Sequence, residues 1–225
     1  MAYHPLMFVT DLPTRVPVLR TPSWIFALPA ICASFLLVIA CLQPWITLTE
    51  ALRDVQAVVF KMEDRNTIPL AGFLSNFGIM AWVASSAAAG FAATMAATKR
   101  TSVMLGALAV LSLVLAVDDF FIIHERVGPI LLGIPEKLFF LTYVAALLTI
   151  IVVFFTEIRR MAGGLLVVAT VFFVVSLTTD VFYLLDGVPH RILEDGAKLF
   201  GIAYWLTFCW RLSWVALHWE GDAPT

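Results

Sequence analysis

Long apolar stretches alternate with short polar ones along the chain. A membrane-spanning helix needs about 20 mostly apolar residues to cross a hydrocarbon core of about 30 Å. Six stretches have this length, and the segments between them are too short for a separate soluble domain. The pattern predicts an all-α polytopic membrane protein with six transmembrane helices arranged as three helical hairpins, at about 24–46, 70–97, 102–123, 137–157, 161–185 and 190–217.

The composition agrees with this class and excludes several others. Hydrophobic residues make up 61% of the 225 residues and charged residues only 13%, whereas a soluble domain carries about 25% charged residues. The net charge of −2 offers no basic surface, so we expect no nucleic-acid partner. The three cysteines lie inside apolar stretches and lack C-x-x-C spacing, which disfavours a disulfide framework or a thiolate metal site.

The chain divides into three parts. We expect a cytoplasmic N-terminal segment at 1–23, a single six-helix transmembrane domain at 24–217, and a cytoplasmic tail at 218–225. The longest connection, at about 48–69, has apolar residues near helical spacing with charges between them. This spacing predicts a short amphipathic helix on the outer membrane surface.

Basic pairs set the expected orientation. Lys99-Arg100 and Arg159-Arg160 lie in very short connections, where positive charge has most effect in keeping a segment cytoplasmic. We therefore expect both termini in the cytoplasm and the protein in the plasma membrane, the inner membrane of a bacterium.

An internal repeat relates the second and third hairpins. A shift of 61 residues aligns them without gaps and matches Asp119 with Asp180 and Lys137 with Lys198. Matches of Asp and Lys are uncommon by chance in such an apolar chain. We interpret the hairpins as parallel repeats about an axis along the membrane normal.

Carboxylates within or beside apolar stretches are the main functional signal. An ionisable side chain inside a bilayer costs at least about 2.5 kcal/mol and is normally paired or functional. Asp118, Asp119, Asp180 and Asp195 are in such positions. Asp119 and Asp180 recur in the repeat and lie deep, so we predict that they are the catalytic residues.

Two histidines fall near the same membrane face as these acids. His190 and Glu194 have the i, i+4 spacing that places two ligands on one side of a helix. Imidazole and carboxylate groups together suit zinc, manganese or iron. The sequence predicts a divalent metal ion held by ligands from the set His124, His190, Glu194, Asp119 and Asp180.

Other charged residues surround this predicted site. Asp118, Glu125 and Asp195 add to an excess of four carboxylates over Lys and Arg on this face, which protons or a bound cation would balance. Lys137 and Lys198 could instead form ion pairs with Asp119 and Asp180 across the hairpins. Such pairs would hold the helices together.

The combination of His and Asp on transmembrane helices resembles membrane-embedded hydrolases of the alkaline ceramidase and adiponectin receptor type, which use such residues around zinc. The chain differs from them in its last helix, where His190 and Glu194 stand in place of two histidines, and in having six rather than seven expected spans. Neither ligand residues nor activity are carried over from that resemblance.

Three functions fit these observations. The carboxylate excess and the histidines favour an extracytoplasmic cation-binding site, in a metal-dependent enzyme acting on a lipid or other apolar substrate. The same carboxylates could relay protons or cations in a small transporter or channel. The third alternative is a non-catalytic subunit of a larger membrane complex, with membrane lipids and other subunits as its partners.

Overall fold

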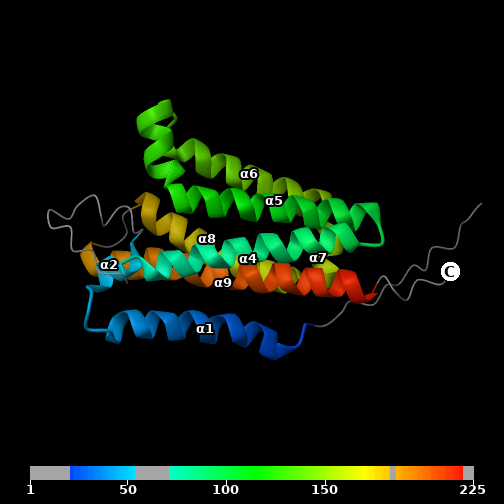
Figure 1. Ribbon diagram of the computed structural model, residues 1–225, viewed down its shortest axis with the longest axis horizontal. Helices are drawn as coiled ribbons and strands as arrows, with labels where there is room; N and C mark the ends of the chain where they lie inside the picture. Colours follow the sequence, from blue (N-terminus) through cyan, green and yellow to red (C-terminus); the bar gives the residue numbers. More distant parts are fainter. Residues whose placement is uncertain (1–20, 54–70, 183–185, 220–225) are drawn as a thin grey trace, which may run out of the picture.

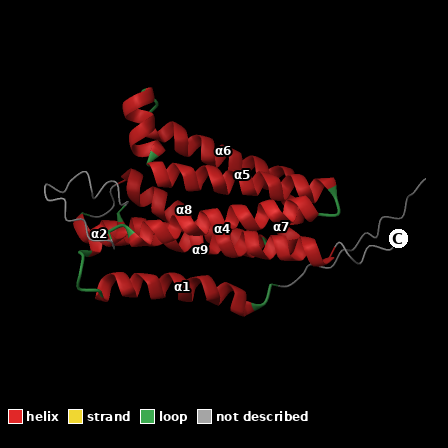
Figure 2. Cartoon of the chain, in the orientation of Figure 1, coloured by secondary structure: helices red, strands yellow, loops and turns green. Residues whose placement is uncertain are grey.

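The described part of the chain consists of helices joined by short connections. This computed structural model describes residues 21–53, 71–182 and 186–219, which contain no strand (Figures 1 and 2). The all-α class is therefore confirmed. The helices are α1 (Ser23–Leu42), α2 (Leu48–Leu52), α4 (Phe73–Met95), α5 (Lys99–Phe121), the π-helix η1 (Ile123–Leu132), α6 (Glu136–Val153), α7 (Phe155–Met161), α8 (Gly163–Phe182) and α9 (Gly187–Trp219).

Within the described residues, five helices are long and apolar enough to cross a membrane, namely α1, α4, α5, α6 and α8. The sequence predicts six spans, and the sixth would be α9. This helix has 33 residues, but its first half carries His190, Arg191, Glu194, Asp195 and Lys198. Its length suits a span and its polar first half lowers its hydropathy, so the sixth span stays a prediction.

The long helices run up and down in one bundle (Figure 1). α9 lies between α4 and α8 and also contacts α1 and α2, while α5 packs against α4. The start of α1 and the end of α9 lie at one end of the bundle. We call the other end, where α5 and α8 end and α9 begins, the site end.

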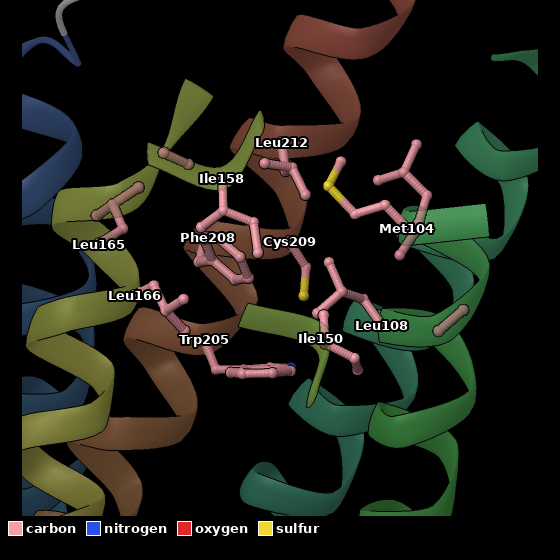
Figure 3. Close-up of a cluster of buried hydrophobic side chains, with 14 of the residues drawn as sticks. Met104, Leu108, Ile150, Ile158, Leu165, Leu166, Trp205, Phe208, Cys209 and Leu212 are labelled. Carbon is pink, nitrogen blue, oxygen red and sulfur yellow. The ribbon is translucent and has the colours of Figure 1, made fainter. Parts of the chain in front are cut away.

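Away from the site end, a dense apolar core holds the bundle together. Trp205 and Phe208 of α9 are at most 1% exposed, and they meet side chains from α5, α6, α7 and α8 (Figure 3). Burial of each large side chain contributes about 1.5–3 kcal/mol where it is shielded from water, and close packing adds dispersion. Figure 3 also shows Met104, Leu108, Ile150, Ile158, Leu165, Leu166, Cys209 and Leu212 in this core.

The connection from α5 to α6 is helical rather than a simple loop. Ile122 adopts a left-handed conformation with φ of 51°, which ends α5, and η1 follows at once. A β-branched residue rarely takes this conformation, which costs about 1–2 kcal/mol. Gly133, with φ of 65°, ends η1 and turns the chain into α6. In Figure 1 this segment projects from the site end of the bundle.

The predicted outer helix at 48–69 is described only in part. Residues 48–52 form α2, which begins with a capping box between Thr47 and Glu50 and buries Ala51 and Leu52 against the bundle. Residues 54–70 lie outside the described residues. The predicted N-terminal segment and C-terminal tail also fall mainly outside them.

The predicted repeat finds one parallel in the helix boundaries. α5 ends at Phe121 and α8 ends at Phe182, positions that the 61-residue shift relates. The next segments differ, because η1 and α6 are separate helices whereas α9 is continuous from Gly187. The repeat stays a prediction.

Two glycines provide a test of this packing. A Cβ at Gly201 of α9 would lie 2.7 Å from the Phe173 ring, which stacks on Trp82, whereas a Cβ at Gly106 of α5 would meet no atom within 4 Å. We expect Gly201→Ala to lower the free energy of unfolding by about 1–3 kcal/mol through overpacking. Gly106→Ala should raise it by up to about 1 kcal/mol through helix propensity. Thermal unfolding in detergent, followed by tryptophan fluorescence, measures both, and an equal or higher Tm for Gly201→Ala would contradict this packing.

Candidate functional site

A cavity of about 340 Å³ opens at the site end and contains most of the charged residues singled out in the sequence. Residues of α2, α4, α5, η1, α6, α8 and α9 line it. Among the described residues its lining includes seven carboxylates but four Lys or Arg side chains, so the described part of the cavity has an excess of carboxylates. These charged residues are Asp118, Asp119, Glu125, Glu136, Asp180, Glu194 and Asp195, with Arg53, Arg126, Arg191 and Lys198.

Asp118 and His124 form a buried ionisable pair in this cavity. Asp118 is 3% exposed and His124 6%. One carboxylate oxygen of Asp118 accepts a hydrogen bond from the His124 backbone N–H at 2.9 Å, and the other lies 2.5 Å from His124 Nδ1. The left-handed turn at Ile122 makes this possible, because it brings η1 back toward the last turn of α5. Both hydrogen bonds offset the strain of that turn.

The charge of Asp118 also sets the protonation of His124. Burial of the ring lowers the His124 pKa, but the hydrogen bond and negative charge of Asp118 outweigh burial and raise the pKa above its ordinary value. Glu125 acts in the same direction, since its Oε1 lies 3.8 Å from His124 Nε2. A metal ion that binds this imidazole must therefore displace a proton that is held more firmly than usual.

Asp119 joins three helices. Its Oδ1 accepts from Lys198 Nζ of α9 at 2.8 Å, and its Oδ2 accepts from the Trp82 indole N–H of α4 at 3.1 Å. The structure thus pairs one of the two candidate lysines with one of the two deep aspartates. Lys137, by contrast, is exposed on α6 and does not line the cavity.

Asp118 and Asp119 belong to a group of three residues that could hold a metal ion. Asp118, Asp119 and His124 each offer one ligand atom, and these atoms lie within 4.8 Å of one another. Ligand atoms bound to one zinc ion at about 2.0–2.2 Å are at most about 4.4 Å apart, so small side-chain rotations would bring them onto one ion. Two carboxylates and an imidazole suit zinc, manganese or iron.

The other predicted ligands form a second group. His190 Nε2 and Arg191 Nη1 both lie 3.2 Å from Glu194 Oε2, so the i, i+4 spacing does produce a contact. His190 is buried but does not line the cavity. The structure therefore brings His124 to the aspartates and keeps His190 in a local contact on α9.

Asp180 of α8 also lines the cavity. It is close enough to Glu136 of α6 and Glu194 of α9 for their charges to interact, and all three line the cavity. Asp195 also lines the cavity and is half-buried. Asp180, the second predicted catalytic residue, thus faces the same space as Asp119 as a member of a cluster of carboxylates.

Two cavity residues escaped the sequence analysis. Trp82 has an indole N–H in the middle of an apolar helix, which needs an acceptor when buried, and that requirement was a usable signal. Tyr143 lies beside Asp118, close enough for its hydroxyl to interact with that carboxylate.

Comparisons with known proteins identify the family to which this chain belongs. No curated protein matches this chain, and no solved structure matches it. One family model matches residues 24–212, which extend from α1 well into α9 and include every residue of the candidate site. The chain therefore belongs to the family described as Domain of unknown function (DUF8692).

Proposed function

We propose that this protein binds one divalent cation, zinc, manganese or iron, at Asp118, Asp119 and His124, and acts as a membrane-embedded enzyme on a lipid or other apolar substrate. One observation carries the proposal. Three ligand atoms, two of them on buried residues, lie within 4.8 Å of one another in a cavity where, among the described residues, carboxylates outnumber Lys and Arg side chains by seven to four. Negative charge in a low-dielectric site needs compensation, and a cation provides it.

The contacts of Asp119 are compatible with this role. A carboxylate has about four lone-pair directions on its two oxygens. Asp119 uses two of them for Lys198 and Trp82, which leaves capacity for a metal ion. These donors would hold the carboxylate in place, in the manner of the outer-shell partners that orient metal ligands.

Asp118 and His124 would share the ion in this proposal. The Asp118 carboxylate contacts His124 Nδ1 in the structure, so a cation held by both residues would take the place of the proton between them. A bound Lewis-acidic cation would polarise a substrate carbonyl or activate water. The carboxylates around Asp180 would supply general acid–base groups across the cavity.

The arrangement of the bundle supports an extracytoplasmic site. Lys99-Arg100 lies at the start of α5, and Arg159-Arg160 lies near the end of α7. Both pairs are at the end of the bundle opposite the site. With these basic pairs in the cytoplasm and α9 as the sixth span, both termini are cytoplasmic. The cavity then faces outward from the plasma membrane, which we take to be a bacterial inner membrane.

The packing disfavours the transporter alternative. The floor of the cavity includes Trp82, Phe173 and Trp205, and beyond it lies the apolar core of Figure 3. Within the described residues, the buried hydroxyls of Ser85 and Ser213 donate to backbone carbonyls one turn earlier on their own helices. A proton or ion path would need polar groups through this core.

One contact favours the subunit alternative as a second candidate. The Lys198–Asp119 ion pair joins α9 to α5, and such pairs can serve only to hold helices together. Partner subunits would then cover the exposed apolar helix faces. The metal and ion-pair experiments below separate this role from a cation-binding one.

The first experiment compares the two buried histidines. Purified protein is exchanged into buffer with zinc, manganese or iron(II), and bound metal is measured by elemental analysis and calorimetry. We expect one ion per chain, His124→Ala to weaken binding roughly 100-fold or more by removing a ligand, and His190→Ala to stay within about threefold of wild type. Absence of bound metal from every wild-type preparation would overturn the proposal.

The second experiment removes the ion pair. Lys198→Met leaves Asp119 with an uncompensated, partly buried charge, which should lower the free energy of unfolding by about 1–3 kcal/mol without metal. Under the proposal, zinc restores much of this stability, because the cation replaces the lost positive charge. Thermal unfolding with and without zinc measures both effects. A loss of stability that zinc does not reduce would support the purely structural role.

A further inference from the structure

A second hollow adjoins the candidate site. It forms a groove between α5 and α6 with a volume of about 590 Å³, within the range of about 300–1,000 Å³ that is common for ligand sites. Among the residues that the structure describes, its lining is apolar apart from Asp118, Thr142 and Tyr143. The remaining lining residues are Leu113, Val114, Val117, Ile123, Ile134, Leu138 and Phe139.

This groove faces the surroundings of the bundle. Leu113, Val117 and Leu138 line it and are 50%, 39% and 48% exposed. Its walls, α5 and α6, are two of the helices long and apolar enough to cross a membrane. In a bilayer, lipid hydrocarbon surrounds such helices, and it is continuous with this groove.

The groove reaches the candidate metal site. Asp118 and Tyr143 line both the groove and the 340 Å³ cavity, and the two side chains lie side by side. Asp118 in turn contacts His124. A molecule with an apolar chain in the groove would therefore place its polar end at the residues that separate the groove from the site.

The unusual surroundings of α6 agree with this arrangement. Phe140, Val144 and Leu147 face the cavity, whereas Phe139 and Thr142 face the groove. Among all residues of α6 only Ile150 is buried. A soluble helix would gain little from an apolar surface on every side, but a helix that meets lipid chains on several sides needs one.

We propose that the groove between α5 and α6 binds the hydrocarbon chain of a membrane lipid and presents the polar end of that lipid, past Tyr143, to the site at Asp118. The apolar groove indicates that the substrate is a long-chain lipid, which enters sideways from the bilayer. The chemistry at the polar end rests on the proposed function, whereas occupation of the groove by the chain does not.

The experiment uses the full chain in nanodiscs of phosphatidylcholine and phosphatidylglycerol, with a minor fraction of phosphatidylcholine that carries a photoactivatable diazirine on one acyl chain. After illumination, mass spectrometry maps the cross-linked peptides. Val117→Trp and Leu138→Trp fill the groove from opposite walls. Val110→Trp is the matched control, because Val110 lies two turns earlier on α5, is 64% exposed and does not line the groove.

We expect wild-type cross-links to concentrate on the groove segments of α5 and α6. They should fall roughly fivefold or more in both groove variants, since each indole occupies space that the chain needs, and stay unchanged in Val110→Trp. Cross-links spread evenly over the exposed helix faces, or unaffected by either groove variant, would overturn the proposal. Thermal unfolding of all three variants confirms that they remain folded.

Zinc content, measured on the same samples, separates the groove from the proposed function. Val117→Trp should retain zinc, because it alters no ligand, while Asp118→Asn should lose it. Wild-type protein that shows groove cross-links but binds no metal would overturn the metal site and support the groove by itself.

Discussion

The hydrogen-bonded ion pair at Asp119 is the contact on which the arrangement of the site end depends. Its carboxylate receives one donor from α4, Trp82, and one from α9, Lys198, which lie 37 and 79 positions away in the chain. An isolated charge in a low-dielectric interior costs several kcal/mol, whereas a paired and hydrogen-bonded one is tolerated. Three helices must therefore meet at this point. Because neighbouring residues on a helix point about 100° apart, fixing Asp119 also fixes the direction of Asp118, toward η1.

The bundle divides its tasks along its length. Away from the site end, Trp205, Phe208 and their neighbours fill the interior and supply most of the close packing. At the site end α6 stands apart from α8, and the space between them remains a cavity with acids from both helices. A membrane permits this separation, since lipid hydrocarbon solvates an apolar helix as well as a protein neighbour does. In water the same gap would expose a large apolar surface.

The sequence predicted the acidic face but not how its residues pair. Hydropathy and the cost of burying charge identified Asp118, Asp119 and Asp180, and all three line one cavity. The repeat treated Lys137 and Lys198 as equivalent, yet the structure shows an ion pair to an aspartate for Lys198, while Lys137 is exposed on α6. The reason is tertiary: α9 packs in the middle of the bundle, whereas α6 lies at its margin.

The histidines show the same division between local and long-range information. The contact of His190 with Glu194 follows from helical spacing, which a sequence contains in full. The contact of His124 with Asp118 needs the left-handed turn at Ile122, and no residue type there announces it. The positions of the apolar helices and the presence of acids within them were determined by the sequence alone. The reason is that hydropathy, and the free-energy cost of moving a charge out of water, are properties of individual segments. Only the tertiary structure decided which of the acids, lysines and histidines come together. Their convergence depends on the unusual turn at Ile122 and on which helices pack against one another.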